Sequence, residues 1–93
     1  MSYRVQFDPR AARELADLTP TVRERVARRV NPLALDPRPR NAIRLAHDLS
    51  GEYRLRIGDC RGSYSIDTEA GSVRVWAVGH RSRFYDEEGR RRR

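Results

Sequence analysis

Residues 53–66 constrain the fold of this chain more than any other stretch, because they have the pattern of a β-hairpin. From Tyr53 to Ile57, apolar side chains alternate with two arginines, which is typical of a half-buried strand. Gly58-Asp59 follows as a two-residue turn, and glycine can take the positive φ that a type II′ turn needs first. A loop of this length fixes which residues of the two strands face each other.

The predicted register places arginines side by side on one face of the hairpin. Arg56 lies opposite Arg61, at about 5 Å between Cβ atoms, and Arg54 is a diagonal neighbour at about 7–8 Å. The large apolar residues of the hairpin fall on the other face. Like charges in these positions repel, so the cluster favours a bound anion, and phosphate matches planar guanidinium groups best. A solvated polar face with splayed arginines explains the same pattern.

The charge of the chain is in keeping with an anionic partner. Its 93 residues include 20 arginines and no lysine, and the formal net charge is +7. This charge predicts nucleic acid, an acidic protein or both as partners, although a GC-rich genome also favours arginine. A single cysteine excludes an internal disulfide and suits the cytoplasm. We find no signal segment, membrane-spanning run or metal-ligand spacing, and therefore expect a cytoplasmic protein without metal or cofactor.

Two helix starts follow a first strand, which alternation predicts over residues 3–7. Asp8 and Thr19 are each followed by proline, the pattern of an N-cap with proline at the first helical position. We expect a first helix that reaches about Leu18. The second helix should stop or kink near Val30, because another proline follows closely. Together the two helices form a helical hairpin.

The rest of the chain completes the predicted fold. Residues 72–78 are the most β-prone run and should form an inner strand, whereas residues 42–51 are either a turn of helix or an extended connector. Residues 82–88 predict one helical turn. The order βααβββ then gives a single α+β domain over residues 1–89, with an antiparallel-rich sheet of about four strands and the helical hairpin on one face. Residues 90–93 form a basic tail.

These features resemble the RelE/ParE toxin superfamily of bacterial type II toxin–antitoxin systems. The resemblance rests on the hairpin, on Gly79-His80-Arg81 at the end of the last strand, on Tyr85 and on the order of the elements. It implies a toxin that is neutralised by a cognate acidic antitoxin and reaches operator DNA only through that complex. RelE-like members are ribosome-dependent mRNA endoribonucleases. ParE-like members instead inhibit DNA gyrase and usually lack the basic catalytic residues.

Carried over by position, the resemblance also implies a site of the ribonuclease type. Its residues are Arg54 and Arg56 for binding RNA and its phosphate, and Arg61, Arg81 and Tyr85 for catalysis. Because arginine keeps its proton at neutral pH, proton transfer moves to His80, a residue type with a reference pKa of about 6.5. In the other scheme the arginines only stabilise the charged phosphorane, while water or ribosomal RNA moves the protons.

Two further functions stay open. A ParE-like chain would inhibit a topoisomerase without catalysis, although the arginine, histidine and tyrosine set argues against this. A catalytically weakened toxin would act as an antitoxin-binding module in DNA repression. Two departures from the family pattern bear on activity: Gly62-Ser63 stand in place of apolar β-branched residues, and arginines replace the hairpin lysines.

Overall fold

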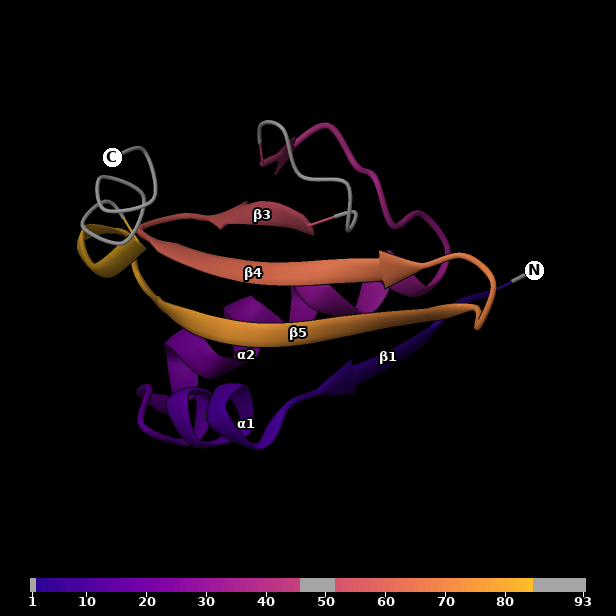
Figure 1. The fold of residues 1–93 in the computed structure, drawn as a ribbon. Helices are drawn as coiled ribbons and strands as arrows, with labels where there is room; N and C mark the ends of the chain where they lie inside the picture. Colours follow the sequence, from indigo (N-terminus) through magenta and orange to yellow (C-terminus); the bar gives the residue numbers. More distant parts are fainter. Residues whose placement is uncertain (1, 46–51, 85–93) are drawn as a thin grey trace, which may run out of the picture.

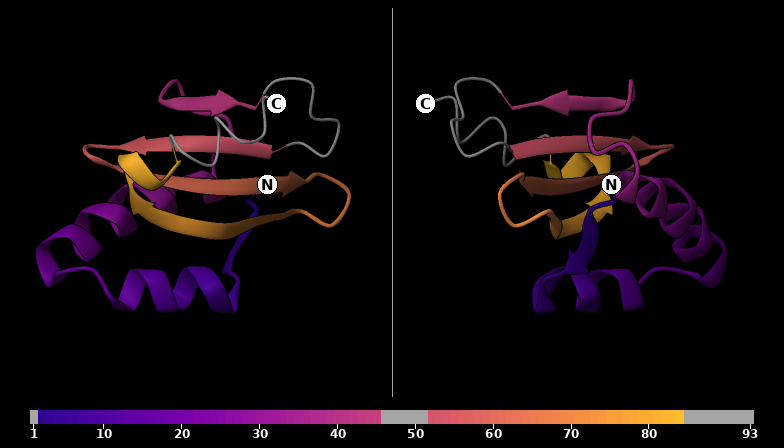
Figure 2. Two further views of the ribbon diagram at one scale, coloured as in Figure 1. Left: turned by 60° about the vertical axis from the view of Figure 1, so that its left-hand side comes forward. Right: turned by 90° about the vertical axis from the view of Figure 1, so that its right-hand side faces the viewer.

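A computed structural model describes residues 2–45 and 52–84 of the chain. Its elements, in chain order, are β1 (Arg4–Phe7), α1 (Pro9–Ala16), α2 (Pro20–Val30), the 3-10 turn η1 (Asn31–Ala34), β2 (Ala42–Arg44), β3 (Glu52–Ile57), β4 (Cys60–Asp67) and β5 (Ser72–His80). Residues 81–84 add one helical turn. Both α-helices lie on one side of the sheet, so the predicted α+β class is confirmed (Figures 1 and 2). Tyr85 and the basic tail lie outside the described residues.

The sheet has five strands in the order β1-β5-β4-β3-β2. β1 runs parallel to β5, and the other neighbours are antiparallel. The prediction of about four strands missed β2, which lies within the segment left open between helix and extended chain. Asn41 ties this short strand to β3: its carbonyl accepts from the Arg56 N–H at 3.0 Å, and its Nδ2 donates to the Arg56 carbonyl at 3.2 Å. A strand of three residues is too short to show alternation in sequence.

The predicted hairpin register is confirmed. Arg56 pairs with Arg61 and Arg54 pairs with Ser63 across β3 and β4. Gly58 has a φ of +58°, the left-handed value that the turn requires of its first central residue. β5 is an inner strand, as predicted, because β4 and β1 flank it.

The helix boundaries differ from the prediction in two respects. α1 ends at Ala16, two residues earlier than expected. Asp8 occupies the N-cap position without a capping hydrogen bond, because its carboxylate forms an ion pair with Arg74 of β5. Thr19 does cap α2, since its Oγ1 accepts a hydrogen bond from the Val22 N–H at 3.4 Å. α2 stops at Val30 and the chain continues as η1.

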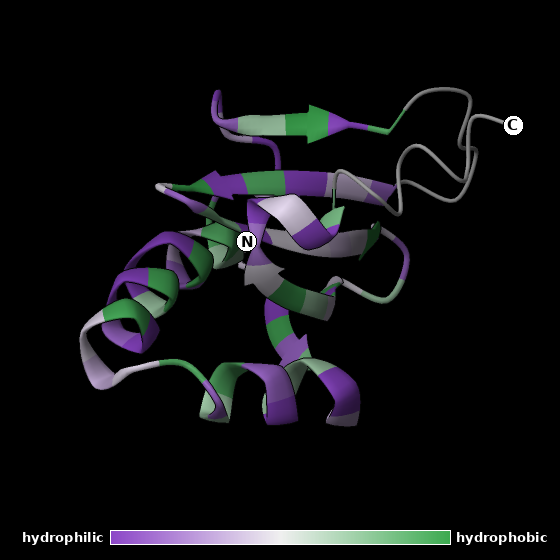
Figure 3. Cartoon of the chain, turned by 90° about the vertical axis from the view of Figure 1, so that its left-hand side faces the viewer, coloured by the Kyte–Doolittle hydropathy of each residue, from purple (hydrophilic) through white to green (hydrophobic). Residues whose placement is uncertain are grey.

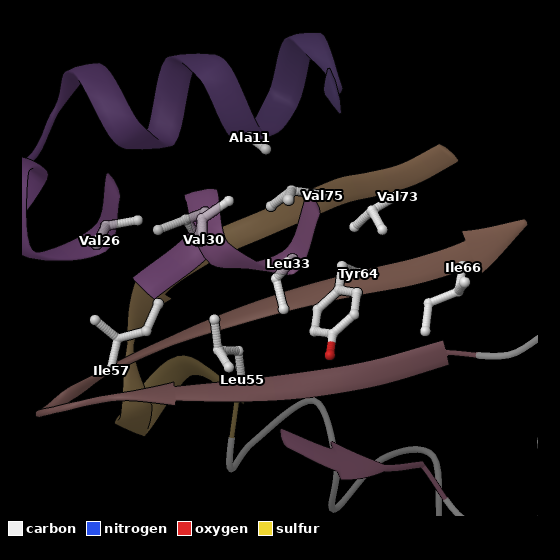
Figure 4. Packing of buried hydrophobic residues seen from close by; sticks show 11 residues of the cluster. Ala11, Val26, Val30, Leu33, Leu55, Ile57, Tyr64, Ile66, Val73 and Val75 are labelled. Atoms are coloured by element: carbon white, nitrogen blue, oxygen red, sulfur yellow. The ribbon is translucent and has the colours of Figure 1, made fainter. Parts of the chain in front are cut away.

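The core fills the space between the helices and one face of the sheet (Figure 4). Hydrophobic and hydrophilic residues both occur around each helix, so each has an apolar side to bury (Figure 3). Ala11 of α1 is fully buried against the cluster, and its small size lets the helix approach the sheet. The core consists of Ala11, Val26, Val30, Leu33, Leu55, Ile57, Tyr64, Ile66, Val73, Val75 and Val78. The opposite face is left for the hairpin arginines.

Candidate active site

The hairpin turn and the end of β5 meet at one end of the sheet. Arg61 on β4 pairs with Gly79 on β5, and just beyond the strand the Arg81 N–H donates to the Asp59 carbonyl at 2.8 Å. The fold therefore brings residues of the hairpin close to residues at the end of β5, which are distant in sequence. We call this group the arginine end; it consists of Arg56, Arg61, His80 and Arg81.

Arg56 and Arg61 lie side by side, but their side chains are held differently. Arg56 is exposed on β3. Arg61 is half-buried, and its Nη1 donates to the carbonyl oxygens of Gly58 at 2.9 Å and Cys60 at 2.8 Å. Arg61 therefore closes the turn that positions it. These two carbonyl acceptors offset the repulsion expected between the neighbouring arginines.

Arg54 lies on the same face but is not presented to solvent. Only 7% of this residue is exposed, and its guanidinium carbon lies 5.0 Å from the ring centroid of Phe84. Phe84, in the turn over residues 81–84, is itself 4% exposed. The C-terminal turn thus covers Arg54 by a cation–π contact. Arg54 is therefore buried, whereas Arg56 of the same strand is exposed.

His80 has a defined hydrogen-bond environment at the end of β5. It pairs with Cys60, so side-chain alternation places it on the face opposite Arg56 and Arg61. The Ser82 N–H donates to His80 Nδ1 at 3.2 Å, and the Ser82 hydroxyl lies 3.0 Å from the same atom. An amide donor at Nδ1 requires a lone pair there, so the proton of the neutral ring is on Nε2. In this arrangement Nε2 is a hydrogen-bond donor.

Glu14 of α1 was not predicted as part of this region. Its Oε1 accepts from the Val78 N–H at 2.9 Å, and its Oε2 accepts from Arg83 Nη2 at 2.8 Å and Arg10 Nε at 3.3 Å. Burial by itself raises the pKa of this carboxyl, but the hydrogen bonds from Val78, Arg83 and Arg10 outweigh it and lower the pKa overall. One weak signal for Glu14 is present in the sequence, because it is the only acidic residue of α1 and follows Arg10 by four positions.

Residues 2–45 and 52–84 contain no group of three or more His, Cys, Asp or Glu side chains that could hold a metal ion. None of the helices among these residues is both long and apolar enough to cross a membrane.

Comparisons with known proteins agree on one family. A family model described as "ParE toxin of type II toxin-antitoxin system, parDE" matches residues 5–85. The search of curated proteins gave no match. Several of the similar solved structures are toxins named RelE or complexes that contain one.

Three of these structures show the extent of the similarity. The toxin–antitoxin complex RelBE2 from Mycobacterium tuberculosis has 31% identity and a TM-score of 0.75, over 86% of this chain and 99% of that chain. The archaeal RelE–RelB complex from Pyrococcus horikoshii OT3 has 26% identity and a TM-score of 0.78, over 89% and 99%. A mutant of E. coli toxin RelE in the free state has 31% identity and a TM-score of 0.74, over 98% of each chain. With a family match over most of its length and this fold, the chain belongs to the RelE/ParE superfamily of type II toxin–antitoxin toxins.

Proposed function

We propose that this toxin is an mRNA endoribonuclease that acts on the ribosome, and that the arginine end is its active site. The observation that carries the proposal is the meeting of Arg56, Arg61 and Arg81 where the hairpin turn joins the end of β5. The resemblance implies that gyrase inhibitors of this superfamily usually lack such a set. Three arginines on backbone that meets at one end of the sheet suit a phosphate better than a protein surface.

The proposed reaction is attack of an mRNA 2′-hydroxyl on the adjacent phosphate. The phosphorus–2′-oxygen bond forms, the phosphorus–5′-oxygen bond breaks, and the intermediate phosphorane carries an additional negative charge. Arg56 and Arg81 are exposed and able to contact its oxygens. Arg61 is fixed by the turn carbonyls, so it adds positive charge that needs no reorganisation during the reaction.

The environment of His80 favours the scheme in which the toxin stabilises charge and does not carry the proton. A base at Nε2 needs its lone pair there and a proton on Nδ1. A proton on Nδ1 would face the Ser82 N–H, which donates to this atom. We therefore infer that His80, on the face opposite Arg56 and Arg61, does not act as the base at Nε2. Water or ribosomal RNA then takes the proton of the 2′-hydroxyl and protonates the leaving 5′-oxygen.

An acidic antitoxin is the second proposed partner, and operator DNA is reached only through that complex. The net charge of +7 favours a negatively charged segment laid over the domain. Similar structures include an E. coli RelE mutant in complex with an antitoxin RelBc peptide. Because charge contributes to binding, the complex should weaken as the salt concentration rises. The cytoplasm, where ribosomes and antitoxin are present, is the proposed location.

Two assays on the purified toxin test the proposal. The first maps cleavage of an mRNA on programmed ribosomes by primer extension, and the second measures supercoiling by DNA gyrase. We expect new mRNA ends within the ribosomal site and unchanged supercoiling. Gyrase inhibition without mRNA cleavage would replace the proposal by the ParE-like function. The matching family model is described as a ParE toxin, in agreement with that alternative. If the toxin neither cleaves mRNA nor inhibits gyrase, the remaining function is that of an antitoxin-binding module.

A further inference from the structure

β5 extends further than the strand that pairs with its outer edge. The last residue of β1 in the ladder is Phe7, opposite Val75, and the Asp8 N–H still donates to the Val75 carbonyl at 2.9 Å. Beyond this point the strand edge faces α1. There the Val78 N–H donates to Glu14 Oε1 at 2.9 Å. A side chain of α1 thus accepts a hydrogen bond from a backbone N–H that has no partner strand on this edge.

The second oxygen of the same carboxylate binds the C-terminal turn. Glu14 Oε2 lies 2.8 Å from Arg83 Nη2, and the Glu14 side chain is only 13% exposed. The two bonds of Glu14 to β5 and the turn span 64 and 69 positions of sequence. Glu14 therefore links α1 to β5 and to the turn over residues 81–84. The hydrogen bond is charge-assisted and its carboxylate is mostly buried, but the Arg83 side chain is 55% exposed, so water weakens the ion pair.

Gly79 leaves room for the Arg83 side chain that binds Glu14. A Cβ atom at Gly79 would lie 2.9 Å from Arg83 Nη1, so the end of the arginine side chain would have to shift. The arginine side chain thus lies directly over this glycine of β5. The next residue, Phe84, covers Arg54. Two adjacent side chains hence attach the turn to two different elements, α1 and β3.

We propose that Glu14 is a positioning residue for Arg81, acting through Arg83; this inference rests on the proposed function. Arg81 is the first residue of the turn that Arg83 fixes, and its own N–H is bonded to the Asp59 carbonyl. Release of the turn from Glu14 frees Arg81 to move relative to the hairpin arginines. A displacement of about 1 Å from the reacting phosphate is enough to cost on the order of 10² in rate.

Two single variants and their combination test the positioning role. Glu14→Gln keeps one acceptor but puts an amide N–H₂ where Arg83 donates, and Arg83→Ala removes the donor. We expect each to lower the single-turnover rate at saturating ribosomes by about 10–100-fold, with the half-saturating ribosome concentration nearly unchanged. The double variant should be no slower than the slower single one, because both changes break one contact. Arg28→Ala is the matched control, since it removes an exposed arginine paired with Glu24 on α2.

Amide hydrogen exchange tests the same contact without any enzymatic readout. In Arg83→Ala, the Arg81 N–H should exchange at least about tenfold faster than in the wild type. The Arg4 N–H, bonded to the Gly71 carbonyl at the other end of the sheet, should keep its rate. If the wild type cleaves no mRNA but the Arg81 amide exchanges faster in Arg83→Ala, the proposed function is rejected. The contact between Glu14 and Arg83 is then still supported as one that holds the turn. Full cleavage rates in both variants, with unchanged exchange at Arg81, would overturn the inference.

Discussion

The two stacked tyrosines of the hairpin give a matched test of the fold, because only one of them has a buried hydroxyl. Their ring centroids are 5.6 Å apart with an interplanar angle of 17°. Tyr64 is 1% exposed, and its hydroxyl donates to the Pro37 carbonyl at 2.7 Å. The Tyr53 hydroxyl instead accepts from Arg38 Nε at 3.0 Å in an exposed contact. Each Tyr→Phe change removes one oxygen atom and keeps the ring.

Tyr64→Phe should destabilise the toxin by about 1–3 kcal/mol. The change removes a buried hydrogen bond and leaves the carbonyl of the buried Pro37 without this partner. Tyr53→Phe should cost less than about 0.5 kcal/mol, because Arg38 can turn to water. For a domain of this size, 1 kcal/mol corresponds to about 4–8 °C in Tm.

Thermal unfolding followed by far-UV circular dichroism measures both shifts under identical conditions. We expect a fall of about 4 °C or more for Tyr64→Phe and almost none for Tyr53→Phe. Burial also raises the pKa of the Tyr64 hydroxyl well above its usual range. Its stabilising effect is therefore complete below about pH 10 and is lost as the pH rises further, and Tyr64→Phe removes this alkaline loss. Equal Tm shifts for the two variants would refute the placement of Tyr64 in the core.

Three further predictions concern charged and titratable groups. Arg61→Ala should lower the free energy of unfolding by about 1 kcal/mol in urea titrations, because the bonds to the turn carbonyls are lost; a rise would mean that repulsion from Arg56 dominates. His80→Gln should change the cleavage rate less than about tenfold between about pH 5.5 and 7.5. An inflection in the wild type that the variant lacks would identify His80 as the proton carrier. The Arg74 hydrogen bond lowers the pKa of Asp8, and the pKa of Glu14 is lowered as well, so both stabilise the fold above the ordinary carboxyl range. Urea midpoints should therefore fall as the pH drops below about 5, and less so in Glu14→Gln; equal losses in that variant would contradict the role of Glu14.

Local patterns in the sequence predicted the hairpin and its arginine pair correctly. Alternation from Tyr53 and a two-residue turn at Gly58 leave only one register that buries the apolar face. The resemblance implied that Arg61 and Arg81 belong to one site, and in the sheet Arg61 pairs with Gly79, two residues before Arg81. Such features depend on neighbours in sequence or on a single strand pairing, so a pattern can reveal them.

Contacts between segments that are distant in sequence could not be predicted from local sequence patterns. Arg54 makes a cation–π contact with Phe84, thirty positions later, whereas alternation predicts only the face on which Arg54 lies. Asp8 has the sequence pattern of an N-cap, yet its carboxylate forms an ion pair with Arg74 of β5 instead of capping α1. Glu14 has only a weak local signal, its spacing of four positions from Arg10, which a solvent-exposed helix residue can share. In each case a tertiary partner outweighs the local preference.

The most direct test of the central claim is the single-turnover rate of mRNA cleavage on programmed ribosomes by Arg56→Ala. This side chain is exposed and faces the proposed phosphate site, so its removal should leave the fold intact. We predict a rate lower by about 10²–10³, as for loss of one group that stabilises the transition state. Arg28→Ala, with the same change of charge on α2, should stay within about threefold of the wild type. Wild-type cleavage by Arg56→Ala would contradict the assignment of the arginine end as the active site.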